Sequence, residues 1–492
     1  MKIHPKLKDY IWLLIPIILF IPSVFFDFAV DDYTLIVNNP FQNIWTKFHA
    51  NQYCPLVYTI WQFLISIAGK VPSIFHLTNL LVHICSVYLV YSMLKRLGIS
   101  DGTSKLAALL FAIHPLQVES VVNCANLKHL LATAFSLASI RIQLSRVRFK
   151  AIISAILFAL GLLSMPSACM APVVSFVLLT VFMRTGLKHS LLTVSVCFGS
   201  LLIYALAFNQ RIFHKYILSV LESLGVGVFN IIFYSWKLIV PFPLTIDYGW
   251  SPIHIVSSTW FPLTFIIGTL MAVAFLYFKK RLSFSLLIAI ICMVPTLGFV
   301  PYFHQYISNV SDRFVYFSMF GVALFIGLLL DKYHKQLKYY PVIILCIFGA
   351  LSFKQQFYWV SNDVIFPYGH NENSTNSLHI MYKHYLDNKK PKLAMKYLKK
   401  LADNKVKDSD LYLRTGRVGL AVDTLLDVTK LYELHPEAHK NLSRLYLILS
   451  KMESFHFETF KQSIDSEKGM ELKGYNLGIS EDKNGIRIFY TK

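Results

Sequence analysis

The stretch VDDYTLIVNNP, residues 30–40, directly follows an apolar run over residues 11–26 that is long enough for most of a membrane crossing. Its two adjacent aspartates, Asp31 and Asp32, would lie close to a bilayer surface, where desolvating a carboxylate costs free energy. Aromatic side chains flank the pair, with Phe28 before it and Tyr33 after it. This pattern predicts a loop that lies on the membrane surface.

Two explanations of the acidic pair are open from these residues. In the first, the pair is functional: one carboxylate acts as a general base, or the pair holds a metal ion or a donor phosphate. In the second, Asp31 or Asp32 is a solvated helix cap that accepts backbone N–H bonds. A functional pair needs partners at the same face of the membrane, so the rest of the chain bears on the choice.

The composition is that of an integral membrane protein. Of the 492 residues, 55% are hydrophobic and 15% are charged, whereas a soluble domain carries about 25% charged residues. The mean hydropathy is +0.52. The apolar runs are about 15–22 residues long, as in membrane helices, and lack the alternation of an outer-membrane barrel. The sequence therefore predicts an α-helical polytopic membrane protein.

The net charge of +20 and the seven cysteines argue against two other classes of protein. Much of the positive charge lies in short loops between apolar segments, where it sets orientation, so we expect no nucleic-acid partner. Most of the cysteines lie inside apolar segments and predict no disulfide framework.

The basic N-terminus sets the predicted orientation. Lys2, Lys6 and Lys8 place it in the cytoplasm, and no clear cleavage site follows, so we expect an uncleaved first helix and a non-cytoplasmic loop 27–73. About eleven crossings are expected, and an odd number puts the C-terminus outside. Residues 225–240 are interpreted as a re-entrant or interfacial segment. The predicted crossings are residues 11–26, 76–94, 106–114, 127–140, a helix pair turning at Met165 and Pro166, 191–208, 260–279, 286–300, 317–330 and 341–353.

The composition changes after Phe353, which predicts a membrane domain over residues 1–354 and a polar, all-α domain over residues 355–492. The second part has helical periodicity in segments that begin near Leu378, Leu411 and His435, with a spacing of about thirty residues that resembles degenerate tetratricopeptide repeats. Such repeats stack into a concave surface that binds peptide. The alternative is an ordinary helical bundle.

Polar residues gather on one face of the predicted helix 76–94. His76, Asn79 and His83 are spaced by three, four and seven positions, so they share one face, which should point into the helix bundle. No third ligand at a suitable distance supports a zinc site here. Hydrogen bonding between helices is the alternative to a direct chemical role, and it is favoured for His83.

A second polar group follows the predicted helix 106–114. Pro115 should end or kink this helix, which would hold His114 and Glu119 at the same membrane face as the acidic pair. Arg313 falls in another outer loop and could bind a phosphate with two parallel hydrogen bonds. The alternative is a local surface pair between Asp312 and Arg313, which would contribute little.

The chain carries six motifs in a fixed order: Asp31-Asp32 with Asn38-Asn39-Pro40, Tyr53-x-Pro55-Leu56, Phe75-His76-Leu77-x-Asn79-Leu80-Leu81-x-His83, Leu110-Phe111-Ala112-x-His114-Pro115-x-x-x-Glu119-Ser120-Val121, Asp247-Tyr248 and Asp312-Arg313-Phe314-x-Tyr316. Together they resemble one family, the transmembrane and tetratricopeptide-repeat O-mannosyltransferases with their bacterial relatives, within the GT-C glycosyltransferases. The resemblance covers roughly residues 11–353, and the C-terminal repeats fit the same plan.

The resemblance implies an inverting transfer of a mannose-like sugar from a polyprenyl-phosphate donor to a hydroxyl of a protein or glycan acceptor, which the repeats could hold. It implies that Asp31 is the catalytic base and that Asp32 orients it or the sugar, with a divalent cation, Mg²⁺ or Mn²⁺, at this pair if one is used. Positions implied for binding the donor phosphate or substrate are His114, Glu119, Arg313, Lys128 and His76. The expected location is a bacterial inner membrane with the site on the periplasmic side, or the endoplasmic reticulum in a eukaryote.

The sequence departs from the family pattern at three places. Cys54 stands where relatives have arginine, Met165 where a lysine is common, and His129 where an acidic residue follows the conserved basic pair, of which Lys128 alone is kept. These departures leave open a catalytically inactive membrane scaffold with a peptide-binding repeat domain. A lipid or sugar transporter is the third possibility, although no inverted repeat is visible.

Overall fold

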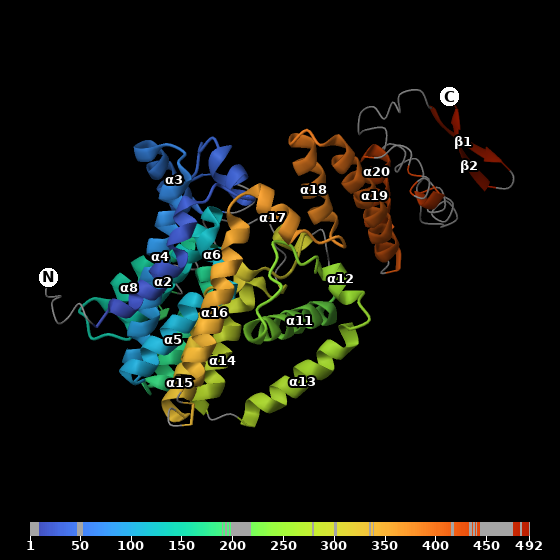
Figure 1. The fold of residues 1–492 in the computed structure, drawn as a ribbon. Coiled ribbons are helices and arrows are strands. Elements are labelled where there is room, and N and C mark those ends of the chain that lie inside the picture. Colours follow the sequence, from blue (N-terminus) through green and yellow to red (C-terminus); the bar gives the residue numbers. More distant parts are fainter. Residues whose placement is uncertain are drawn as a thin grey trace. The chain divides into compact units, whose positions relative to one another are not determined.

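The protein is described here by a computed structural model, drawn in Figure 1, in which the chain divides into two compact units, Met1–His370 and Asn371–Lys492. The described residues are 9–46, 53–188, 190–191, 194–195, 197, 218–277, 280–299, 303–333, 336–337, 339–414, 418–431, 435, 438, 440–442, 476–482 and 485–491.

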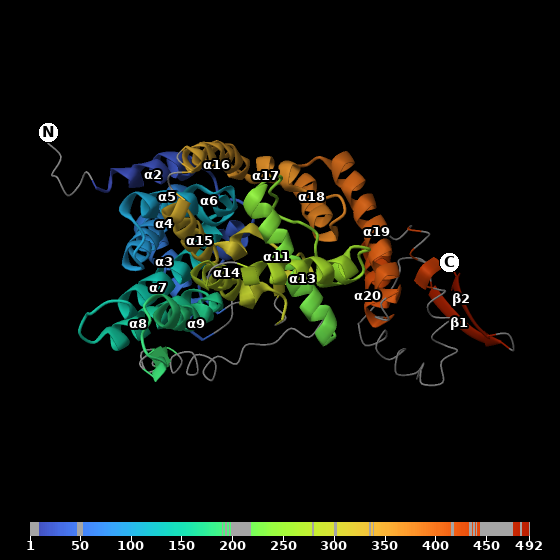
Figure 2. The same cartoon turned by 90° about the horizontal axis from the view of Figure 1, so that it is seen from below.

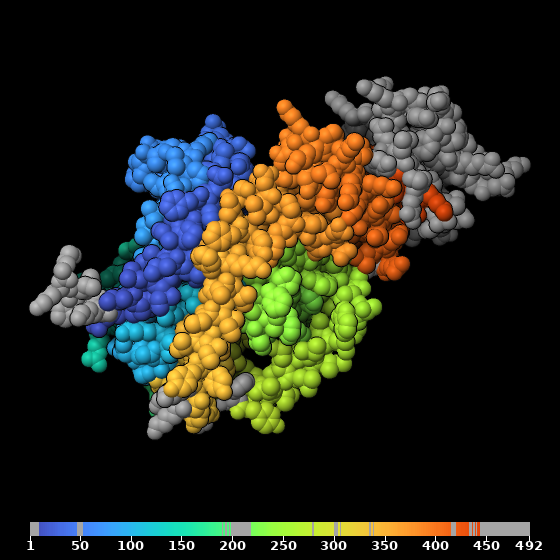
Figure 3. Space-filling view, in the orientation of Figure 1, coloured from blue at the N-terminus to red at the C-terminus, as the bar shows by residue number. Residues whose placement is uncertain are grey.

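The first unit is helical throughout its described part. Figure 2 shows α2 beside α16, and these two helices are in contact. Figure 3 shows α16 and α17 as a continuous band along one face of this unit. The α-helices are α2 (Leu14–Phe20), α3 (Pro55–Ala68), α4 (Pro72–Arg96), α5 (Asp101–Ile113), α6 (Val118–Val122), α7 (Leu127–Gln143), α8 (Lys150–Ser164), α9 (Ala171–Val177), α11 (Val220–Ile239), α12 (Pro252–Val256), α13 (Phe261–Tyr277), α14 (Lys280–Met293), α15 (Met319–Tyr333), α16 (Tyr340–Gln356) and α17 (Asn362–Gly369).

Short 3₁₀ and π turns connect these helices. They are η1 (Ile11–Leu13), η2 (Ile21–Phe25), η3 (Tyr33–Val37), η4 (Pro115–Gln117), η5 (Cys124–Asn126), η6 (Pro166–Met170), η7 (Leu178–Phe182), η8 (Val294–Thr296), η9 (Phe303–Tyr306), η10 (Asp312–Val315) and η11 (Phe357–Trp359).

Two helical runs of the described chain, α4 and Tyr340–Trp359, are long and apolar enough to cross a membrane. The pair Asp101–Ile113 and Pro115–Val122, bent by 54°, is a third if it forms one span. Five further apolar helices are shorter. The count of about eleven crossings therefore stays a prediction, and its segment 191–208 lies mostly outside the described residues.

The break at Pro115 is confirmed, and the surrounding side chains compensate for it. Because Pro115 has no N–H and the chain turns there, the carbonyls of residues 111–113 lose their helical partners. Gln117 Nε2 donates to the Phe111 carbonyl at 3.1 Å, His83 Nε2 lies 3.1 Å from that of Ala112, and Ser352 Oγ donates to that of Ile113 at 2.7 Å. The bent helix can therefore remain buried.

The first outer loop, 27–73, contains a helix of its own, α3, which is largely apolar. Its buried face includes Tyr58 and Trp61, which join a hydrophobic cluster with Cys124 and Leu127 at the start of α7. The tertiary contacts therefore keep this segment helical and packed, although its 14 residues are fewer than a membrane-spanning helix needs.

The second unit contains the helices α18 (Thr375–Asp387), α19 (Pro391–Arg414) and α20 (Val418–Leu431), which pack in sequence. It also contains an antiparallel pair of strands, β1 (Asn476–Asp482) and β2 (Gly485–Thr491), in which Asn476 pairs with Thr491 and Asp482 with Gly485. The all-α expectation was therefore wrong for this end of the chain. The segment 485–491 is rich in β-branched and aromatic residues, which favours a strand.

The boundary between the units lies later than the sequence suggested. The predicted boundary followed residue 354, but the first unit extends to His370. Trp359 and Ile365 are buried in its main hydrophobic core, so the polar residues after Phe353 still pack on the membrane helices. The described part of the second unit does not decide between tetratricopeptide repeats and another helical arrangement, and the repeats stay a prediction.

A tight helix contact gives a stability prediction. A Cβ atom at Gly321 of α15 would lie 2.4 Å from the backbone nitrogen of Ala289 in α14. We therefore expect Gly321→Ala to destabilise the protein by about 1–3 kcal/mol, because backbone cannot yield as a flexible side chain does. Thermal unfolding of the purified protein measures this. Gly102→Ala is the control, since a Cβ there meets nothing within 4 Å, and equal melting temperatures for the two variants would contradict the prediction.

Candidate active site

The loop that carries the acidic pair is attached to the body of the first unit by backbone hydrogen bonds. The N–H of Asp27 donates to the Val360 carbonyl at 3.0 Å, and that of Val30 donates to Asn362 Oδ1 at 2.7 Å. Val30 adopts a left-handed conformation with φ of 52°, which is uncommon for a β-branched residue and costs of order 1–3 kcal/mol. The loop is therefore held in a specific shape just before Asp31.

Asp32 is completely buried and serves the backbone. Its Oδ2 accepts from the N–H of Ala29 at 3.0 Å, and its Oδ1 accepts from that of Ala125 at 2.6 Å. Ala125 belongs to the turn η5 that leads into α7. Asp32 thus satisfies two backbone donors and joins the first loop to α7. It accepts backbone N–H bonds, but it is not the solvated helix cap of the second explanation, because it is buried and its side chain makes no cap bond to the turn η3 that follows it.

The protonation of Asp32 reflects its burial. Desolvation raises the pKa of its carboxyl to about 7, the neighbouring Asp31 charge raises it further, and the bonds from the Ala29 and Ala125 N–H groups oppose the rise. A carboxyl that titrates near neutral pH is a functional candidate by itself. Its lack of exposure, however, keeps it from direct contact with a substrate.

Asp31 differs from its neighbour in exposure, because it is partly accessible. Its charge interacts with the cations of Lys128 and Arg313, which come from α7 and η10. The two adjacent carboxylates therefore have different environments: Asp32 accepts bonds from backbone N–H groups, and Asp31 lies within Coulombic range of Lys128 and Arg313. The structure brings together three residues that were predicted for the site from distant parts of the chain.

Glu119 and Arg313 form a buried ion pair. The Glu119 carboxylate accepts from Arg313 Nη1, from the Arg313 backbone N–H at 3.1 Å and from Ser311 Oγ at 3.3 Å. The other terminal guanidinium nitrogen, Nη2, lies 3.2 Å from His304 Nδ1. Glu119 therefore fixes both the backbone and the side chain of Arg313. The predicted alternative, a surface pair between Asp312 and Arg313, was wrong because both groups are buried and have other partners.

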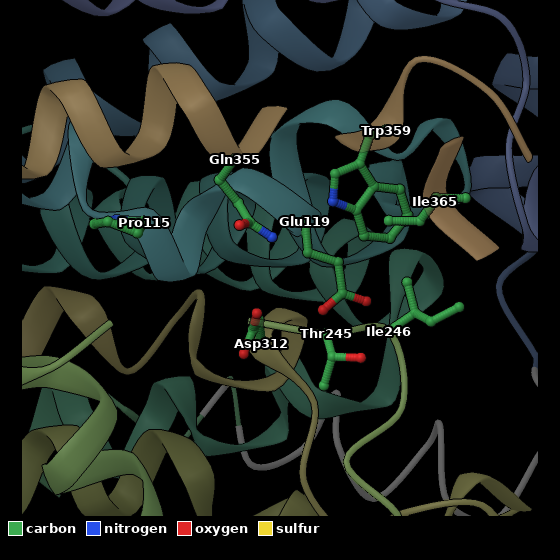
Figure 4. A pocket seen from close by; sticks show the side chains of 8 residues that line it. All are labelled: Pro115, Glu119, Thr245, Ile246, Asp312, Gln355, Trp359 and Ile365. Carbon is green, nitrogen blue, oxygen red and sulfur yellow. The ribbon is translucent and has the colours of Figure 1, made fainter. Parts of the chain in front are cut away.

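Asp312 makes its own buried contact. Its Oδ1 accepts from the Tyr248 hydroxyl at 2.8 Å. Burial raises the pKa of the Asp312 carboxyl well above its usual range, and the nearby Glu119 charge raises it further. Figure 4 shows the carboxylates of Glu119 and Asp312 at a narrow crevice that also borders Thr245, Trp359 and Ile365.

Two small empty spaces lie beside this ion pair. The crevice at Glu119 and Asp312 has almost no cavity volume, and a second space, which borders Arg313, His129 and Thr133, has a cavity volume of about 10 Å³. Ligand pockets are usually about 300–1,000 Å³. Both spaces are therefore too small for a sugar in this structure.

The three histidines singled out from the sequence have hydrogen-bond partners within the protein. His114 Nδ1 accepts from the Leu116 N–H at 3.2 Å and Nε2 lies 3.1 Å from the Leu238 carbonyl, so its ring has no nitrogen left for a phosphate. His83 Nδ1 lies 2.7 Å from the Tyr316 hydroxyl, which confirms hydrogen bonding between helices. His76 is buried, with Nε2 3.4 Å from the Asp27 carbonyl.

The described donors do not fit a metal site. No group of three or more His, Cys, Asp or Glu side chains among them could hold an ion. Both Asp32 oxygens already accept backbone N–H bonds. The divalent cation that the resemblance allowed at Asp31 and Asp32 therefore has no supporting ligand set here.

Two of the departures from the family pattern are neighbours. Cys54 Sγ lies 3.8 Å from Met165 Sδ, and Cys54 is buried. Two positions where the family resemblance led us to expect basic residues thus meet as a sulfur contact in this chain. Sequence reasoning missed His304 and Asn362, for which no motif gave a signal, because their partners are distant in the chain.

No protein-family model matches the chain. One curated protein, Protein O-mannosyl-transferase F38B6.6 of Caenorhabditis elegans, is 23% identical over 374 residues, which cover 67% of this chain and 52% of that protein. The chain thus spans about half the length of this relative.

Two solved structures show a partial likeness. The Archaeoglobus fulgidus oligosaccharyltransferase in its apo form has a TM-score of 0.41 and 15% identity, covering 78% of this chain and 60% of its own. ArnT from Cupriavidus metallidurans has a TM-score of 0.40 and 11% identity, covering 89% and 78%.

The resemblance to the protein O-mannosyltransferases that the motifs predicted agrees with this curated relative from Caenorhabditis elegans, to which the chain is similar at 23% identity.

The raised pKa of Asp32 predicts a pH-dependent stability. The folded state favours the protonated carboxyl of Asp32. The contribution of this carboxyl to the free energy of unfolding is therefore complete below pH 3.8 and is lost as the pH rises through about 7. Between pH 5 and pH 8 this loss is up to about 3 kcal/mol.

Asp32→Asn should remove that part of the profile. The free energy of unfolding of the wild type and of Asp32→Asn is measured at intervals from pH 5 to pH 8. It should decline less with rising pH in the variant than in the wild type. Asp27→Asn, at an exposed position in the same loop, is the control and should follow the wild type. Parallel profiles for all three proteins would show that Asp32 does not titrate in this range.

Proposed function

We propose that the protein is an inverting glycosyltransferase that moves a mannose-like sugar from a polyprenyl-phosphate donor to a hydroxyl of a protein or glycan acceptor, on the outer face of the membrane. The observation that supports this most is the placement of a partly exposed carboxylate, Asp31, within electrostatic range of two buried cations, Lys128 and Arg313. A base beside two cations suits a reaction that removes a proton and releases a phosphate.

In the proposed reaction Asp31 takes the proton of the acceptor hydroxyl while its oxygen attacks the anomeric carbon of the sugar. A new C–O bond forms on one face of this carbon, and the bond to the phosphate oxygen breaks on the other, which inverts the configuration. The electron pair leaves with the lipid phosphate. Lys128 and Arg313 stabilise the negative charge that develops on it, an effect that is larger in a site that excludes water.

Other residues hold this arrangement in place. Glu119 orients Arg313 through three hydrogen-bond donors of the Ser311–Arg313 segment. Asp32 positions Asp31 by fixing the loop to Ala125. We assign His114 no contact with the donor because both its ring nitrogens have backbone partners, and we keep His76 only as a packing residue.

One observation favours the second candidate, an inactive scaffold. The sulfur contact between Cys54 and Met165 lies where the family resemblance led us to expect two basic residues, so less positive charge is available to a phosphate. Purified protein with labelled polyprenyl-phosphate sugars separates the two: transfer to an acceptor, or hydrolysis of the donor, requires an enzyme. The absence of both with every donor tested would support the scaffold.

The base gives the first prediction for this function. We expect Asp31→Asn to lower turnover by about 10²–10⁴-fold, the usual cost of losing a general base, with donor binding largely kept because asparagine is nearly isosteric. The assay is sugar transfer by the purified protein, with donor affinity measured separately. Asp27→Asn is the matched control and should retain activity.

Two outcomes would contradict this assignment. If Asp31→Asn retains near-normal turnover while Asp32→Asn is inactive, the buried carboxyl is the base and the roles are reversed. If neither substitution changes transfer, the first loop is not the catalytic centre.

The membrane orientation gives a second prediction. By the distribution of loop charges, Lys150 lies in the cytoplasm and Asn373 outside, together with Asp31 and Asp312. Reporter fusions at Lys150 and Asn373 should therefore report opposite sides of the membrane, and a fusion at Lys95 should agree with Lys150. Signals from the same side at Lys150 and Asn373 would mean that the tail and the proposed site lie on opposite sides of the membrane.

A further inference from the structure

The turn between α18 and α19 of the second unit forms the tip of a helical hairpin. The helix α18 ends at Asp387 and α19 begins at Pro391, whose fixed φ suits the first helical position. The Lys390 N–H donates to the Tyr385 carbonyl at 2.9 Å, and Lys389 adopts a left-handed conformation with φ of 54°. The two helices pack against each other up to this turn.

Three apolar side chains are exposed at this tip. Leu386 is 50% exposed, Leu393 39% and Met395 55%. Single exposed apolar residues are common on protein surfaces, but a group of them marks a contact site. Unbranched or flexible side chains such as Met395 adapt to an irregular or fluid partner.

The same segment is strongly basic. Residues 383–399 contain six exposed lysines and one acidic residue, Asp387. Within the described part of the chain none of these lysines forms an ion pair. Lysines farther along α19 differ, because Lys400 pairs with Glu372 at 2.5 Å and Lys405 with Asp427 at 3.1 Å. The six lysines are Lys383, Lys389, Lys390, Lys392, Lys396 and Lys399.

We propose that this tip binds the surface of a bilayer that contains anionic phospholipids. Leu386, Leu393 and Met395 would enter the boundary between headgroups and acyl chains, and the lysines around them would contact lipid phosphates. Lysine suits this place because its stem covers apolar surface while its ammonium group stays in the polar layer. Each lysine near such a surface raises the binding constant roughly fivefold.

The observations favour a lipid surface over an acidic peptide. The apolar and basic residues lie at the turn that ends a helical hairpin, whereas peptide recognition by stacked helices uses a concave face. Mixed lysines and exposed aliphatic side chains are typical of segments that lie in the membrane interface. This inference does not depend on the proposed enzymatic activity, and its test does not use activity as a readout.

The test compares the full chain in nanodiscs of neutral phosphatidylcholine with nanodiscs that also contain an anionic phospholipid. Acetylation of individual lysines is followed by mass spectrometry. In the anionic discs we expect Lys389, Lys390 and Lys392 to react at least roughly fivefold more slowly at low salt, and to recover at high salt because the attraction is screened. Lys407, exposed on the same helix away from the tip, should react equally in both.

A variant pair separates the apolar contribution from the charge. The double substitution Leu393→Ser and Met395→Ser should remove the protection while leaving thermal stability unchanged, because both side chains are exposed, and Lys407→Gln should retain it. Equal lysine reactivity in the two kinds of disc would overturn the proposal. So would protection that appears only after an acidic peptide is added, since this would identify a protein partner.

Discussion

The first unit depends on one buried interaction, the ion pair between Glu119 of α6 and Arg313 of η10. It joins positions 194 residues apart in the sequence, and the same carboxylate also holds the Ser311 hydroxyl and the Arg313 backbone. Burying two charges costs several kcal/mol per ion, and removing one partner of such a pair costs about 3–5 kcal/mol. A pair of this kind adds little net stability, so its retention is better explained by the position it gives to Arg313.

The ion pair is possible because the helix before it breaks. The turn at Pro115 leads from α5 into α6 and directs Glu119 toward the Asp312–Val315 segment. Three side chains from three places in the chain, Gln117, His83 and Ser352, satisfy the carbonyls that the break exposes. In a membrane, where water cannot supply these bonds, a broken helix is tolerated only with such partners. The polar face of α4 therefore supports the site without entering it.

The two neighbouring aspartates show how burial separates chemically identical groups. Asp32 is enclosed and accepts two backbone N–H bonds, so its work is to fix the loop against the start of α7. Asp31 remains accessible and interacts with Lys128 and Arg313. Paired acids whose environments differ in this way commonly divide their roles, one positioning and one reacting. The proposed division between base and positioning residue rests on this contrast.

The sequence by itself determined the features that depend on local pattern. Apolar runs predicted the helices α4, α7 and α15, Pro115 predicted the break, and the spacing of His76, Asn79 and His83 predicted a shared polar face. Only the tertiary structure decided that Arg313 pairs with Glu119 and not with Asp312, that Asp32 is buried against Ala125, and that α3 packs inside the first loop. The reason is physical: helix formation and chain breaks follow from neighbouring residues, whereas a side chain's partner and burial are set by the packing of segments that are far apart in the sequence.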